Sequence, residues 1–182
     1  FTDEKVYDPS VSLRQKDRDT DEIYISYSTP KTQNRTYLYN IKTKEKKLVK
    51  EQIIPSGHEP NDYIVERLEC PSHDGRVVPI TITRHKNTPI DGSAELLLYG
   101  YGSYGHSMSP TFSSTRLSLI KRNIIWATAH IRGGMERGMK WWKEGKLLNK
   151  KNTFKDYIAC AKFLIEKKYT SKKKIIGMGP FQ

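Results

Sequence analysis

The stretch GYGSYG, residues 100–105, is the first pattern in this sequence whose residue types could do chemistry. It matches G-x-G-x-x-G and follows an apolar run, as the phosphate-binding turn of dinucleotide-binding proteins does. That turn requires a helix beginning at its third glycine and an acidic residue about 20 positions later. Here Gly105 leads to Pro110, and residues 121–125 read KRNII. We therefore do not predict NAD binding, and we expect no cofactor.

Other chemistry-bearing residues give no local catalytic or metal-binding motif. No G-x-S-x-G occurs, so a serine nucleophile cannot be located by its usual signature. We expect no metal site, because no H-E-x-x-H motif or close ligand pair occurs among His58, His73, His85, His106 and His130. The stretch HIRGG, residues 130–134, has glycines that permit close backbone approach. It is consistent with a tight loop or with a loop beside an active site.

The residues from 61 onward predict the strands and helices that would position such loops. Apolar and β-branched runs favour strands at 64–70, 76–85, 95–101, 123–131 and 173–179. A helix is predicted over 114–122, with Leu117 and Ile120 inward and capped by Ser113 or Ser114. Strands that alternate with helices indicate an α/β sheet, which we expect to be mostly parallel.

The clearest predicted helix covers residues 152–169. Asn152 or Thr153 is expected to cap it, and Asp156 is expected to complement the helix dipole in its first turn. The apolar residues from which we expect its buried face to be drawn are Phe154, Tyr157, Ile158, Ala161, Phe163, Leu164 and Ile165.

Residues 1–60 predict a separate antiparallel β meander. Partial alternation favours strands at 21–29 and 35–41, and a turn at Thr43–Lys44 precedes a short third strand. Prolines and a glycine in IIPSGHEPNDY, residues 53–63, suggest a boundary near residue 60. So small a meander needs a partner to pack against.

The composition predicts a folded but polar protein with a large positive charge. Of 182 residues, 36% are hydrophobic and 10% aromatic, and the net charge is +12. The lysine runs at 42–50 and 167–174 could bind phosphate or nucleic acid, although solvated surface lysines are the favoured interpretation. Cys70 and Cys160 match no disulfide framework, so we expect a cytoplasmic protein. No stretch has the length of a membrane span, and no membrane partner is expected.

Several motifs, taken in order, resemble the prolyl oligopeptidase family and most closely its oligopeptidase B branch. They are LLLYGYGSYG, RLSLIKR, AHIRGGMERG, WWKEGKLLNKKNTFKDY and KKYTSKKKIIGMG. The resemblance runs over nearly the whole chain and is most specific between Tyr63 and Gly179. It implies that residues 1–60 correspond to the end of an N-terminal β-propeller. Residues 61–182 would be the first half of an α/β-hydrolase peptidase domain.

The resemblance also assigns roles to individual residues. Tyr101 matches the tyrosine whose hydroxyl helps to form the oxyanion hole, a role suited to a phenol donor. Phe181 falls where the family has its nucleophilic serine, and Pro180 where it has the preceding glycine. The aspartate and histidine of the family's Ser-Asp-His triad lie further along. Met135 replaces the third glycine of RGGG. We therefore expect a fragment that lacks the triad and is inactive alone.

Three hypotheses follow for the function. The leading one is a fragment of a serine oligopeptidase that, when complete, cleaves short peptides after Arg or Lys. The second is a half-protein that regains activity with a separate C-terminal chain carrying the triad. The third, a basic nucleic-acid-binding protein, is weaker. The strand at 173–179 is expected to have an unpaired outer edge that favours aggregation or pairing with another chain.

Overall fold

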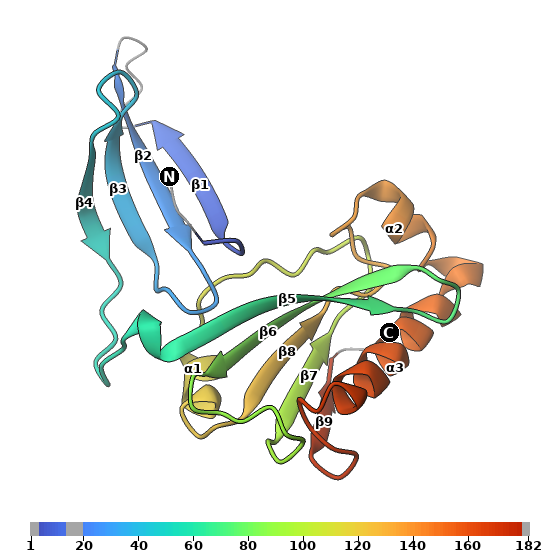
Figure 1. Ribbon diagram of the computed structural model, residues 1–182. Coiled ribbons are helices and arrows are strands. Elements are labelled where there is room, and N and C mark those ends of the chain that lie inside the picture. Colours follow the sequence, from blue (N-terminus) through green and yellow to red (C-terminus); the bar gives the residue numbers. More distant parts are fainter. Residues whose placement is uncertain (1–3, 14–19, 180–182) are drawn as a thin grey trace. The chain divides into compact units, whose positions relative to one another are not determined.

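The computed structural model describes residues 4–13 and 20–179 (Figure 1). The chain divides into two compact units, one formed by Phe1–Pro60 with Ser109–Ser114 and the other by Asn61–Met108 with Thr115–Gln182. No helix of the described residues combines the length and apolarity needed to cross a membrane.

The first unit contains a four-stranded antiparallel sheet in the order β1-β2-β3-β4 (Figure 1). Its strands are β1 (Asp8–Leu13), β2 (Glu22–Ser28), β3 (Arg35–Asn40) and β4 (Lys46–Glu51). The predicted meander is confirmed, and β1 is a further strand that the sequence did not reveal. The sequence of β1, DPSVSL, contains a proline and only two large apolar residues, Val11 and Leu13, and both are exposed.

The second unit contains a five-stranded mixed sheet in the order β5-β6-β8-β7-β9. Its strands are β5 (Tyr63–Pro71), β6 (Val77–His85), β7 (Leu96–Gly100), β8 (Ile125–Ala129) and β9 (Ile175–Met178). Strand β7 is parallel to β8 and β9, whereas β6 is antiparallel to β5 and β8. The prediction of a mostly parallel sheet was therefore wrong. A tight turn joins β5 to β6, and strands joined in this way can pair only antiparallel.

Helices lie on both faces of this sheet. Helix α1 (Ser114–Ile120) connects β7 to β8, and helix α3 (Lys151–Glu166) precedes β9. Arg116 of α1 lies 5.5 Å from the ring centre of Trp126 in β8. Cys160 and Leu164 of α3 belong instead to the core cluster that includes the neighbouring Ala127. Because successive side chains of a strand point to opposite faces, α1 and α3 cover opposite faces.

The hydrophobic core lies between the sheet and α3. It comprises alternate residues of the strands together with residues of α3 and the segments around it, including Cys70, Val78, Ile80, Ile82, Leu96, Leu98, Ile125, Ala127, Ile131, Trp141, Cys160 and Leu164. Shorter elements complete the unit: η1 (Pro60–Asp62), α2 (Met139–Lys143) and η2 (Leu147–Asn149). Leu117 and Ile120 of α1 are buried, as predicted.

Helix α3 differs from its prediction in its cap and in its buried face. The N-cap is Lys150, which makes no side-chain capping bond; neither Asn152 nor Thr153 occupies that position. Phe154 and Ile158 were expected inside but are 40% and 53% exposed. The buried positions are Thr153, Asp156, Cys160 and Leu164. Three of these four are not large and apolar. The predicted face was therefore right only in part: Leu164 is buried as expected, and Tyr157, Ala161 and Phe163 pack against the core.

Candidate active-site crevice

Two loops meet at the carboxyl ends of β7 and β8. The chain leaves β7 towards α1 and leaves β8 towards α3, which cover opposite faces of the sheet. In open α/β sheets, a crevice forms beyond two neighbouring parallel strands whose connections diverge in this way. The loop after β7 begins at Tyr101 and the loop after β8 at His130. This edge of the sheet is therefore the expected place for a site.

Glycines bring the two loops into backbone contact. Gly133 has a φ of +101°, and a Cβ added there would lie only 2.0 Å from the carbonyl oxygen of Gly102. The Gly105 amide donates to the Gly133 carbonyl across 2.9 Å. Only glycine combines that left-handed backbone with so close an approach. The close approach expected for HIRGG is thus present, with GYGSYG as its partner. Met135 lies beside Gly105, where its Sδ would be 3.1 Å from an added Cβ.

Tyr101, the candidate oxyanion-hole residue, directly follows β7 in this crevice. Its side chain is half-buried, and its ring meets the ring of His106 edge-on at 5.4 Å. The remaining positions that the family resemblance singled out, Pro180 and Phe181, lie outside the described residues.

A buried ion-pair network holds the second loop. The Arg132 guanidinium donates to Asp156 from Nε (2.8 Å to Oδ2) and Nη2 (2.6 Å to Oδ1). It also donates from Nη1 to Asp74 (2.6 Å to Oδ2). The Arg132 amide and the Ser72 hydroxyl donate to the same Asp156 carboxylate, at 3.1 and 2.5 Å. Asp156 therefore links α3, the loop after β8 and the β5–β6 turn.

Electrostatics of this network favour the charged forms. Burial alone would lower the pKa of Arg132, but the hydrogen bonds from its guanidinium to Asp156 and Asp74 outweigh burial and raise it. Burial likewise opposes ionisation of Asp74, and the hydrogen bonds that it accepts, chiefly from Arg132, leave its pKa lowered. Arg132 is 1% exposed, so its charge needs these partners. The network is structural: it fixes the loop that borders the crevice.

A second polar cluster surrounds His130 at the end of β8. Arg67 donates from Nη1 to His130 Nε2 at 2.8 Å, and the Thr81 hydroxyl is also 2.8 Å from Nε2. Because arginine can only donate, Nε2 is the acceptor and the proton of the neutral ring is on Nδ1. Nδ1 lies 3.6 Å from Glu136 Oε1 and has no hydrogen-bond partner among the described residues. Burial lowers the pKa of His130, which favours the neutral ring.

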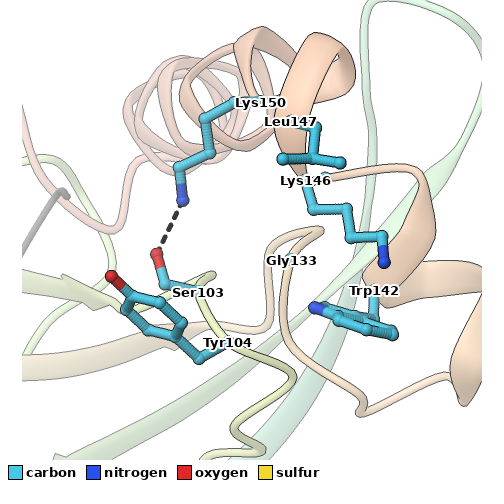
Figure 2. A pocket seen from close by; sticks show the side chains of 8 residues that line it. Ser103, Tyr104, Gly133, Trp142, Lys146, Leu147 and Lys150 are labelled. Atoms are coloured by element: carbon cyan, nitrogen blue, oxygen red, sulfur yellow. Dashed lines mark hydrogen bonds between the residues drawn. The ribbon is translucent and has the colours of Figure 1, made fainter.

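A cavity of about 450 Å³ opens beside the two loops (Figure 2). Its lining residues are Ser103, Tyr104, Gly133, Trp142, Gly145, Lys146, Leu147 and Lys150. Lys150 reaches across to the loop after β7, where Nζ donates to Gly102 O (2.9 Å) and to Ser103 Oγ (2.6 Å). The Lys146 ammonium lies 3.6 Å from the ring centre of Trp142. The cavity wall is thus mainly apolar but carries two ammonium groups.

Sequence reasoning missed most of this arrangement. Arg132 and Asp156 are 24 positions apart, and Asp74 is further away still, so no local spacing connects them. Lys146 and Lys150 are two of many lysines and had no distinguishing feature. Asp156 had been assigned to the helix dipole, and it was not among the residues predicted to be buried, so no signal in the sequence indicated its pairing. Over residues 4–13 and 20–179, no three His, Cys, Asp or Glu side chains gather as metal ligands would.

The fold and the crevice define the class to which this chain belongs. Parallel strands with helices on both faces and loops meeting at their carboxyl ends are features of α/β-hydrolases, and the second unit is the first half of such a domain. Residues 110–180 match the prolyl oligopeptidase family. Over nearly its whole length the chain is similar to members of that family, among them oligopeptidase B.

Individual relatives agree with this assignment. The chain is 40% identical over 97% of its length to dipeptidyl aminopeptidase BI of Pseudoxanthomonas mexicana and 37% identical over 97% to protease 2 of Moraxella lacunata. It covers 24% and 26% of those proteins, so it spans about a quarter of their length. Oligopeptidase B from Trypanosoma brucei, solved with covalently bound antipain, is similar with a TM-score of 0.88 at 35% identity, over 98% of this chain and 26% of that one. The four-stranded β segment that precedes the α/β unit resembles the end of the N-terminal propeller of the prolyl oligopeptidase family.

Proposed function

We propose that this chain supplies the first half of the catalytic domain of a serine oligopeptidase. The complete enzyme would hydrolyse short peptides after Arg or Lys through an acyl-enzyme formed by a Ser-Asp-His triad. The observation that carries the proposal is the position of Tyr101 at the carboxyl end of β7, in the crevice beside the loop after β8. The preference for basic residues rests on the likeness to oligopeptidase B.

In this proposal Tyr101 stabilises the tetrahedral intermediate. A phenol is a hydrogen-bond donor at neutral pH, and a donor aimed at the developing oxyanion lowers the barrier to acyl transfer. The Arg132–Asp156 pair and Gly133 hold the neighbouring loop and so position the crevice wall. None of these residues is a nucleophile or a general base for the reaction.

We expect the 182-residue chain to be inactive by itself. Its sequence contains no G-x-S-x-G, and Phe181, which takes the place of the serine in the family pattern, has no hydroxyl. Phenylalanine cannot form an acyl-enzyme. Activity would therefore require a segment that carries the triad, in the same polypeptide or in another.

A complementing C-terminal chain is the second candidate, and the position of β9 favours it. Strand β9 is at the end of the strand order of the described sheet, paired only with β7. Ile176 and Met178 of this strand are 55% and 49% exposed. An apolar edge with free backbone groups can accept a further strand from another chain. In this proposal that strand belongs to the chain that carries the nucleophile.

The test begins with the endogenous polypeptide, captured from its native cells with an antibody against residues 152–169. Its intact mass and any co-purifying chain are determined by mass spectrometry, and the captured material is assayed with fluorogenic peptides ending in Arg, Lys or Pro. We expect cleavage after Arg and Lys only when a triad-bearing segment is present, in the same chain or in a partner. Cleavage by the recombinant 182-residue chain alone would show that the nucleophile assignment is wrong.

A further inference from the structure

The cavity between Ser103 and Lys150 has the chemistry of a site for an organic anion. It is lined by two ammonium groups, and no Asp or Glu lines it. Among the described residues, no carboxylate lies in an ion pair with either Lys146 or Lys150. Most of the other lysines are exposed on strands and turns, whereas these two are half-buried in one hollow.

Lys150 is held in a fixed position with capacity to bind a ligand. Its ammonium has three hydrogens, and Gly102 O and Ser103 Oγ accept two of them. Figure 2 shows the Lys150 side chain directed from the start of α3 towards Ser103, beside Tyr104. Burial lowers the pKa of Lys150, which means that its charge is under-compensated in the present surroundings. An anion beside Nζ would compensate it.

The other walls select for more than charge. Leu147 and the rings of Tyr104 and Trp142 line the same cavity, and Lys146 covers the Trp142 ring at 3.6 Å (Figure 2). A volume of about 450 Å³ is in the range of small-molecule sites and far exceeds an inorganic oxyanion. A ligand that fills it would combine an anionic group with an apolar side chain. Inorganic phosphate would leave the apolar walls uncovered.

We propose that this cavity binds the C-terminal carboxylate of a short peptide, with Lys150 and Lys146 facing the carboxylate and the apolar walls facing the last side chain. The identity of the ligand rests on the proposed function, because an oligopeptidase would meet short peptides with free C-termini. The cavity adjoins the loop that begins at Tyr101, so a peptide held there by its C-terminus would lie next to the crevice. It would select for short substrates and products by their terminal charge.

The test is binding rather than hydrolysis, so it is independent of catalytic activity. The 182-residue chain is titrated in a calorimeter with N-acetyl-Ala-Leu, with the matching C-terminal amide, and with inorganic phosphate. We expect the acid to bind at one site and the amide to bind at least about tenfold more weakly, since a charge-assisted hydrogen bond is lost. Equal binding of acid and amide, no binding of the acid, or phosphate binding as tight as the acid would each overturn the proposal.

Variants locate the site. Lys150→Met is expected to weaken binding of the acid about tenfold or more, and Lys146→Met to weaken it less, because Lys146 also contacts Trp142. Lys143→Met is the matched control: it removes the same charge from an exposed position of α2 that does not line the cavity. Circular dichroism of each variant establishes that it is folded. Unchanged binding by folded Lys150→Met and Lys146→Met would refute the assignment. The two proposals can fail separately. If the chain binds the acid better than the amide but its assembled form cleaves no peptide, the proposed function is refuted and the anion site is retained.

Discussion

Arg132 and Asp156 form a two-pronged ion pair in which the carboxylate is fully buried and the guanidinium nearly so. The pair joins the loop after β8 to helix α3, and the Arg132 amide bonds to the same carboxylate. A buried pair adds little net stability compared with apolar residues, but breaking it leaves a charge without a partner. Its effect is therefore to specify one position of the loop relative to the helix.

We predict that Asp156→Asn lowers the free energy of unfolding by about 3 kcal/mol, the low end of the range for breaking a buried pair, because Asp74 still faces Arg132. Urea unfolding followed by circular dichroism measures the change. Asp91→Asn, which makes the same chemical change at an exposed carboxylate, serves as control and is expected to have a much smaller effect. Equal effects of the two substitutions would contradict a special role for Asp156.

The ion pair also marks the limit of what the sequence could predict. The strands at 64–70, 76–85, 95–101, 123–131 and 173–179 are all present, because their apolar runs are of strand length, too short for a typical helix, and are bounded by turn residues. The helix at 152–169 is present too, but its buried face was predicted only in part, because Asp156 is buried by its pairing with a distant arginine. Side-chain partners separated by tens of residues are set by the tertiary fold and leave no local pattern.

The crevice was predictable only in part. HIRGG was identified as a close-approach loop, whereas GYGSYG was identified only as a pattern that does not fit a phosphate-binding turn. The contact between the two loops explains why each needs its glycines. The antiparallel half of the sheet was missed, because the hydrophobic runs of β6 and β8 do not differ from those of parallel strands. The cavity was missed as well, because only the fold brings its two lysines beside Ser103 and Trp142.

Gly133→Ala is expected to be more destabilising than an alanine at another left-handed glycine. The added Cβ would meet the Gly102 carbonyl oxygen at 2.0 Å, so one of the two loops must move. At Gly75, φ is +78° and no atom lies within 4 Å of an added Cβ, so Gly75→Ala bears only the backbone strain of about 1–2 kcal/mol. The difference in unfolding free energy between the variants measures the loop contact. If Gly133→Ala and Gly75→Ala lower the free energy of unfolding equally, the contact between the two loops contributes nothing to stability.

Protonation of His130 should make the protein less stable below about pH 6.5. Burial holds the pKa of His130 below its ordinary value of 6.5, in spite of Glu136, and Arg67 opposes a positive charge there. Below pH 6.5 the unfolded chain therefore binds a proton that the folded chain does not, so stability falls as pH falls, by at most about 1.4 kcal/mol per pH unit. Urea unfolding at pH 7.5 and 5.5 measures this. His130→Gln should reduce the difference in unfolding free energy between pH 7.5 and pH 5.5. His106→Gln, the control at an exposed histidine, should leave that difference unchanged. The reverse result would exclude His130 as the cause.

Strand β9 is expected to drive self-association of the isolated chain. Its Ile176 side chain is 55% exposed beside an edge with free backbone groups. Ile176→Lys should therefore shift the protein towards monomer in size-exclusion chromatography with light scattering. Ile53→Lys adds the same charge at a residue that is 85% exposed and outside any strand. If Ile176→Lys and Ile53→Lys reduce self-association equally, the added net charge is the cause, and the outer edge of β9 is not the site of association.

Tyr101→Phe tests the oxyanion-hole role in any active assembly that contains this chain. The substitution removes one hydroxyl and keeps the ring against His106, so folding should be little affected. Loss of one oxyanion donor lowers kcat by about 10²–10³, and KM should change little because the bond forms mainly in the transition state. Tyr99 lies in β7, and its ring stacks on Trp126 of β8. Tyr99→Phe also removes one hydroxyl and should leave both kcat and KM unchanged. A rise in KM with unchanged kcat would instead make Tyr101 a substrate-binding residue. If the Tyr101→Phe variant keeps both constants of the unmodified enzyme, Tyr101 has no role in the site.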